Sequence, residues 1–206
     1  MFGPGEIFML FFITLGPLKV IGPFAHQTRG LAPELVRGIA LRVFVLSLIA
    51  VAVGGLGGRV LMTNWQVSMP ALLISTGVIF FLVALQVVLE QYEPPNAAAA
   101  AELPSDPMKA ALKVTFPTVV TPYGIATIIA LLTAQDPAAS ATVIWAMLAV
   151  VMVLNLVAML SAHAVMHGVV VLGMRLLGAV LGVLQVALAV QIILLALRKL
   201  NVLPAA

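Results

Sequence analysis

Six apolar runs, each long enough to cross a lipid bilayer, make up most of this chain, and mainly short polar stretches separate them. The runs fall at residues 5–25, 38–62, 69–90, 110–133, 141–165 and 174–197. About 20 apolar residues in a helix span the hydrocarbon core of a membrane. Only 8% of the residues are charged, against roughly 25% in a soluble domain, so most of the surface must face lipid. The sequence therefore predicts an all-α membrane protein with six transmembrane helices.

A longer polar linker, residues 91–109, lies between the third and fourth runs and contains several prolines and an alanine string. It divides the chain into residues 1–90 and residues 110–206, with three apolar runs in each part. Because three spans precede the linker, the second part enters the membrane from the opposite side. We therefore expect two three-helix units, the second inverted relative to the first.

The two halves also resemble each other in sequence. When the chain is shifted by 105 residues, Pro17 falls on Pro122. At the same shift, residues 77–89 fall on residues 182–194, and five of these 13 positions are identical. Apolar helices match one another easily, so shared composition remains an alternative explanation. Inverted repeats are typical of secondary transporters, whose substrate binds near the midplane between the repeats.

Lysine and arginine residues between the runs predict the orientation in the membrane. One side receives six of them (Arg29, Arg37, Arg42, Lys109, Lys113 and Arg175) and the other receives three (Arg59, Arg198 and Lys199). Cytoplasmic loops are enriched in these residues, so the six-charge side, with the linker, is expected to be cytoplasmic and both termini periplasmic. A cleaved signal peptide is not expected, because Glu6 stands where such a peptide has a positively charged region.

The first apolar run is interrupted by a proline next to a glycine. Pro17 has no backbone N–H and frees a carbonyl one turn earlier, and Gly16 and Gly22 favour local unwinding. Freed backbone groups within a membrane are tolerated where they are buried in protein or line a wet cavity. An ordinary proline kink is the alternative. We predict that Thr14, Gly16, Pro17, Lys19 and Gly22 contribute to a substrate site.

The fourth run repeats this pattern at the matching place. Its candidate substrate-binding residues are Pro117, Thr118, Thr121, Pro122, Tyr123 and Gly124. Small polar residues in membrane helices often serve helix packing, but the two threonines lie inside the interrupted segment. Two interrupted helices at equivalent positions of the two halves indicate a binding site between them.

Lys19 is the charged residue deepest within an apolar run. It lies roughly 6 Å past the middle of its span, at about 1.5 Å per residue, so its stem could extend to the cytoplasmic interface. Alternatively, it provides a fixed positive charge at the interrupted helix. There it would attract a substrate carboxylate or take the place of a coupling cation.

Other polar and small residues in the runs are expected to pack helices together. Asn155, Gln86 and Gln191 are predicted to form hydrogen bonds between helices. The pair Gly178 and Gly182 allows two helices to approach closely, within one protomer or between two. The sequence is therefore compatible with a homo-oligomer.

Several function classes are excluded or disfavoured. His163 and His167 are one helical turn apart, but Ala164 stands where the H-E-x-x-H motif has its catalytic glutamate. A membrane enzyme acting through these histidines would need a bound metal. The chain has no cysteine, no nucleophile elbow, no phosphate-binding loop and no basic stripe for nucleic acid. We expect a protein that is not an enzyme and uses neither a metal nor another cofactor.

At its two proline-interrupted runs the sequence resembles the MarC family of bacterial inner-membrane proteins, which includes the small neutral amino acid transporters called SnatA. The matching stretches are residues 16–24 and residues 117–123. The resemblance implies a secondary transporter in the bacterial inner membrane, coupled to a cation gradient and carrying glycine- or alanine-like amino acids or related small metabolites. Gly16 and Lys19 depart from the family pattern, which usually has an acidic and a small residue there. The alternative is a membrane scaffold, or a subunit of a larger complex, that transports nothing.

Overall fold

The computed structural model describes residues 3–89, 106–134, 139–166 and 169–204. Most of these residues are helical, and none of them forms a strand. The elements are α1 (Pro4–Leu15), α2 (Leu18–Gln27), α3 (Pro33–Asn64), α4 (Met69–Leu89), α5 (Pro107–Val114), the π-helical turn η2 (Thr115–Val119), α6 (Pro122–Ala134), α7 (Ala139–Val165) and α8 (Val169–Lys199). Most of the predicted linker and His167 lie outside the described residues, as do the side chains of Pro117 and Arg175.

Local sequence signals start several of these helices. Proline occupies the first turn of α1, α3 and α5, where its missing N–H would have no helical partner. The Glu6 carboxylate accepts a hydrogen bond from the Gly3 N–H at 2.9 Å. Asp106 accepts one from the Met108 N–H at 2.8 Å. These bonds satisfy backbone donors that a helix start leaves free.

Length and hydropathy make five segments of the described chain candidate membrane spans: Pro4–Gln27, Pro33–Asn64, Met69–Leu89, Ala141–Val165 and Leu176–Lys199. The first of these contains both α1 and α2. A shorter apolar helix, Pro122–Thr133, belongs to α6. The structure is therefore that of an all-helical protein with several segments able to cross a bilayer.

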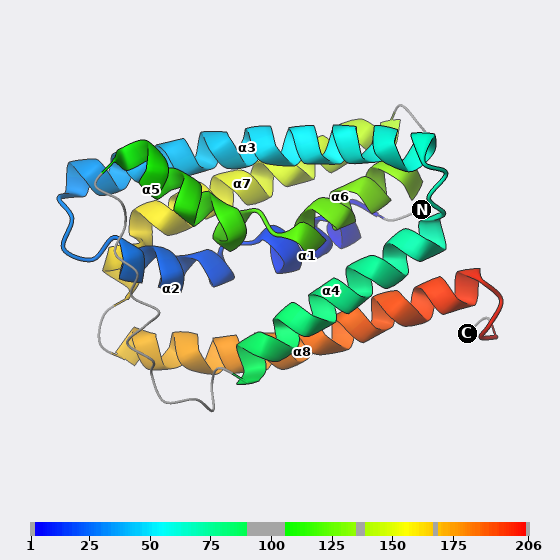
Figure 1. Cartoon of the computed structure of the whole chain (residues 1–206). Coiled ribbons are helices and arrows are strands. Elements are labelled where there is room, and N and C mark those ends of the chain that lie inside the picture. Colours follow the sequence, from blue (N-terminus) through cyan, green and yellow to red (C-terminus); the bar gives the residue numbers. More distant parts are fainter. Residues whose placement is uncertain (1–2, 90–105, 135–138, 167–168, 205–206) are drawn as a thin grey trace.

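The helices form two groups (Figure 1). In the larger group α3 packs against α5, α6 and α7, while α1 and α2 lie against α7. The helices α4 and α8 form a separate antiparallel pair, attached to the larger group mainly where α4 packs on α6. At Gly77 a Cβ atom would lie 2.5 Å from Ile193 Cγ1 and 3.1 Å from the carbonyl oxygen of Ala189. A glycine there lets α4 and α8 approach closely.

One face of α3 is aliphatic and exposed along its length. Val45, Ile49, Val53, Leu56 and Val60 each expose half or more of their surface, and they recur at the spacing of one helical face. A continuous apolar face of this kind on a soluble monomer would drive association. In a bilayer it contacts lipid tails.

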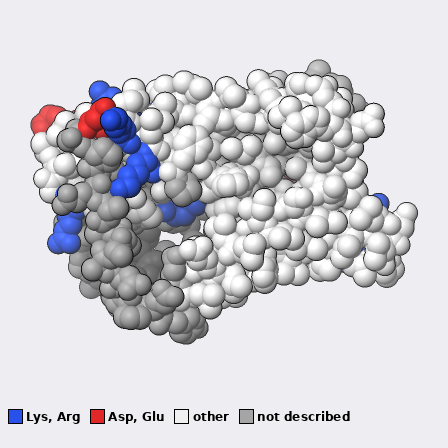
Figure 2. All heavy atoms as spheres, in the orientation of Figure 1, with Lys and Arg blue, Asp and Glu red and all other residues white. Residues whose placement is uncertain are grey.

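The charged side chains lie mainly at one end of the molecule. Figure 2 shows most of the visible lysine, arginine and acidic residues at the end formed by the α2–α3 turn and the start of α5, and an uncharged surface along most of the remaining length. Arg29, Arg37 and Lys109 are exposed at this end. The first residues of α1 and the last of α8 lie at the opposite end (Figure 1).

Candidate functional site

The first helix of the chain is interrupted between Leu15 and Leu18. Gly16 adopts an extended conformation, with φ −78° and ψ 172°, and Pro17 has no N–H to donate. The missing Pro17 N–H concerns the Ile13 carbonyl. Because the chain leaves the helix at the extended Gly16, the carbonyl groups of Thr14 and Leu15 lose the amides four residues on that a continuous helix would give them. At Gly16 a Cβ atom would lie 1.7 Å from the carbonyl oxygen of Phe12, so this bend has no room for a side chain.

Side chains from other parts of the fold satisfy the two freed carbonyls. The amide Nδ2 of Asn155, on α7, donates to the carbonyl oxygen of Leu15 at 2.6 Å. The hydroxyl of Thr121 donates to the carbonyl oxygen of Thr14 at 3.3 Å. The Lys19 ammonium also donates to the Thr14 carbonyl. The predicted interhelical role of Asn155 is confirmed, and its acceptor is the backbone of the interrupted helix.

The second interruption lies directly before α6. Phe116, within η2, has non-helical angles of φ −115° and ψ 125°, and Val120 is extended. Thr121 then caps α6, because its Oγ1 accepts the Gly124 N–H at 3.2 Å, as an N-cap threonine does. The same hydroxyl donates to the Thr14 carbonyl. A single side chain thus joins the start of α6 to the end of α1.

The Lys19 side chain points back toward this junction. Its Nζ lies 3.5 Å from the Tyr123 hydroxyl and 5.2 Å from the centre of the Tyr123 ring, within the range of a cation–π interaction. Tyr123 is buried and stacks on Phe80 of α4, with ring centres 4.6 Å apart. The snorkelling alternative for Lys19 is not the arrangement observed, because the ammonium lies at the helix interruption.

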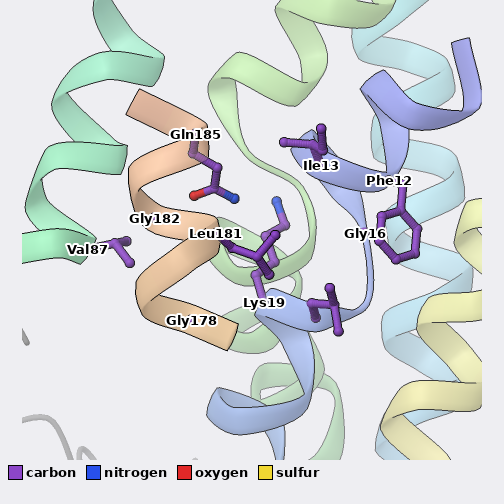
Figure 3. Close-up of a pocket in the computed structure, with 10 residues that line it drawn as sticks. Phe12, Ile13, Gly16, Lys19, Val87, Gly178, Leu181, Gly182 and Gln185 are labelled. Atoms are coloured by element: carbon purple, nitrogen blue, oxygen red, sulfur yellow. The ribbon is translucent and has the colours of Figure 1, made fainter. Parts of the chain in front are cut away.

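A pocket of about 120 Å³ opens beside the first interruption. Its lining comes from the end of α1, the start of α2, α4 and α8: Phe12, Ile13, Gly16, Leu18, Lys19, Val87, Gly178, Leu181, Gly182 and Gln185. The polar ends of Lys19 and Gln185 point into the same space (Figure 3). The pocket therefore combines one cation and one amide with an otherwise apolar wall.

The structure brings together part of the predicted site. Thr14, Gly16, Lys19, Thr121, Tyr123 and Gly124 lie around the junction of the two interruptions. Of these, Gly16 and Lys19 line the pocket. Pro17 precedes α2 and Pro122 begins α6 with its ring exposed. Gly22 and Thr118 are half-buried, away from the pocket lining.

Sequence reasoning missed Gln185, although a signal was present. Gln185 lies three residues after Gly182 and seven after Gly178, so the three share one face of a helix. Both glycines of the predicted packing surface also line the pocket. The glutamines singled out instead, Gln86 and Gln191, are exposed.

His163, in the last turn of α7, has a structural role. His163 Nε2 lies 2.8 Å from the Thr28 hydroxyl, which itself donates to the carbonyl oxygen of Phe24 at 2.7 Å. The hydroxyl therefore accepts from the imidazole, and the bond ties α7 to the end of α2. Among the residues that the structure describes, no group of three or more His, Asp or Glu side chains could hold a metal ion.

Fold and site together define a multi-pass helical membrane protein in which two interrupted helices meet beside a small pocket. Nearly the whole chain, residues 5–201, matches the MarC family of integral membrane proteins, and the chain belongs to this family. Comparison with curated proteins and with solved structures gives no significant match.

Proposed function

We propose that this protein is a secondary transporter of small amino acids, glycine- or alanine-like, or of related small carboxylates, across the bacterial inner membrane. The observation that carries the proposal is the meeting of two interrupted helices at the Thr14 carbonyl, beside a pocket that contains Lys19. Transporter sites are commonly built from such discontinuous helices. The substrate would bind in the pocket, with its carboxylate toward Lys19.

The direction of the helices supports an inverted repeat. With the shift of 105 residues, α1 and α2 correspond to α5–η2 and α6, while α3 corresponds to α7 and α4 to α8. In Figure 1 the two members of each pair run in opposite directions along the molecule. This is the relation expected for two halves of opposite membrane topology. In the proposal, α5, η2 and α6 together form the sixth span.

The pocket suits a small anion-bearing ligand. Its volume of about 120 Å³ corresponds to about four water molecules at roughly 30 Å³ each, which is the scale of glycine or alanine. The start of α2 contributes Leu18 to the lining, and the first amides of a helix carry a partial positive charge. With the Lys19 ammonium, this favours a carboxylate. The Gln185 amide oxygen is available to accept from an amino group.

The charge distribution supports one orientation. The end of the molecule that contains Arg29, Arg37 and Lys109 would face the cytoplasm, because cytoplasmic loops are enriched in such residues. The start of α1 and the end of α8, which lie at the other end, would face the periplasm. Modification of single introduced cysteines from either side of the membrane would test this, since the chain has no cysteine of its own.

Flux of labelled glycine and alanine into proteoliposomes tests the function. Wild-type protein should show saturable uptake, and Gln185→Leu should reduce it at least about tenfold, because one hydrogen bond to a charged ligand group contributes about 1.5–3 kcal/mol and 1.4 kcal/mol is tenfold. Lys109→Met, an exposed change far from the pocket, is the matched control. Folded wild-type protein that neither binds nor moves any small amino acid or carboxylate would refute the proposal. Purification as a stoichiometric complex with another membrane protein would then favour the scaffold alternative.

A further inference from the structure

The ammonium of Lys19 lies among groups that attract a cation: a backbone carbonyl oxygen, a hydroxyl and an aromatic ring. It donates to the Thr14 carbonyl, which the interruption of the first helix has freed. It also lies beside the hydroxyl and the ring face of Tyr123. In transporters with discontinuous helices, unwound carbonyl groups of this kind coordinate the coupling ion. Here the chain's own ammonium makes that contact.

Among the residues that the structure describes, no carboxylate lines the pocket beside Lys19. The ten residues of the pocket lining include no aspartate or glutamate. The bend at Gly16 cannot supply one, because a Cβ atom there would overlap the Phe12 carbonyl. The other two donors at the interruption, Thr121 and Asn155, are neutral. Within the described part of the chain, a second cation beside Lys19 would therefore meet repulsion from the ammonium with no lining carboxylate to offset it.

We propose that Lys19 is a tethered cation that takes the place of an alkali coupling ion, so that a carboxylate binds in the pocket without Na⁺ or K⁺. The proposal rests on the function proposed above and specifies its coupling. It gives Lys19 two connected roles. The ammonium satisfies the Thr14 carbonyl in the empty protein, and it presents its charge to the carboxylate of a bound ligand.

Removal of the charge should open the position to an external cation. In Lys19→Met the stem keeps nearly its length, but the Thr14 carbonyl loses its charged donor. Na⁺ or K⁺ can then approach this oxygen together with the Tyr123 hydroxyl. The variant should acquire a cation dependence that the wild-type protein lacks.

The experiment measures the apparent melting temperature of the purified, substrate-free protein in NaCl, KCl and choline chloride at equal ionic strength. Wild type and the control Lys109→Met should melt at the same temperature in all three salts. Lys19→Met should melt on the order of 3 °C higher in NaCl or KCl than in choline chloride at a cation concentration about ten times its Kd. If Lys19→Met cannot be purified, Lys19→Gln, which also removes the charge, replaces it.

Two outcomes of the melting measurement would overturn the tethered-cation proposal. One is specific stabilisation of the wild-type protein by Na⁺ or K⁺. The other is a charge-removed variant that responds to neither ion. Because the measurement uses no substrate, it is separate from the test of transport. Glycine binding by the wild type that requires Na⁺ would overturn the tethered-cation proposal but not the proposed transport function. Absence of any flux would refute the transport function but not the tethered-cation proposal.

Discussion

The Thr121 hydroxyl has two structural functions, so its removal should weaken the junction of the interrupted helices. It caps α6 by accepting the Gly124 N–H, and it donates to the Thr14 carbonyl. Thr121→Val keeps the shape of the side chain and removes both bonds. Loss of an N-cap costs about 1 kcal/mol, and an interhelical hydrogen bond in a membrane protein contributes about 0.6 kcal/mol. Because Lys19 still donates to the same carbonyl, we expect a total loss of about 1.6 kcal/mol.

This loss corresponds to a little more than a tenfold change in the unfolding equilibrium, at 1.4 kcal/mol per factor of ten. It can be measured by titrating SDS into mixed micelles and following the fluorescence of the two tryptophans, Trp65, which is exposed, and Trp145, which is half-buried on α7. Thr121→Ser, which keeps the hydroxyl, should unfold close to the wild type. A valine variant within 0.5 kcal/mol of the wild type, or a serine variant as unstable as the valine variant, would show that the hydroxyl does not join the helices as described.

Two further substitutions test the first interruption by the same unfolding assay. Gly16→Ala should lower expression and stability severely, because its Cβ would overlap the Phe12 carbonyl. The control is Gly57→Ala, at a helical position with no atom within 4 Å of the added Cβ, which should be neutral or slightly stabilising. Equal stability of the two variants would contradict the observed bend. Asn155→Leu should cost about 1–3 kcal/mol, because the buried Leu15 carbonyl loses its donor, and a stability equal to that of the wild type would mean that the carbonyl has another partner.

The limits of the apolar runs could be predicted closely, but the ends of the helices could not. The run predicted at 38–62 lies within α3, Pro33–Asn64, and the run at 174–197 lies within α8, Val169–Lys199. Hydropathy identifies the stretch of helix whose length must match the thickness of the hydrocarbon core. The helices continue beyond that stretch, where capping and turn residues decide the end.

The candidate site could be predicted in part. Gly16 and Lys19, two residues at the predicted interruption, line the pocket. A proline interruption within an apolar run marks freed backbone groups wherever the helix packs. Gln185 could not be assigned in the same way. A glutamine in an apolar helix can face lipid, pack against another helix or line a binding site. The packing of α8 beside the first interruption places Gln185 in the pocket lining.

Without any structure, the amino-acid sequence predicts a membrane protein and interruptions of its first and fourth apolar runs. Both depend on local physics. The transfer of an apolar helix into lipid and the loss of a backbone donor at proline occur without contacts from other helices. The groups that satisfy the freed carbonyls could be identified from the packed fold alone. Asn155 of α7, Thr121 at the cap of α6 and Lys19 of α2 reach the Thr14–Leu15 segment. Their pairing depends on which helices are adjacent and at which depth, and hydropathy contains no record of either.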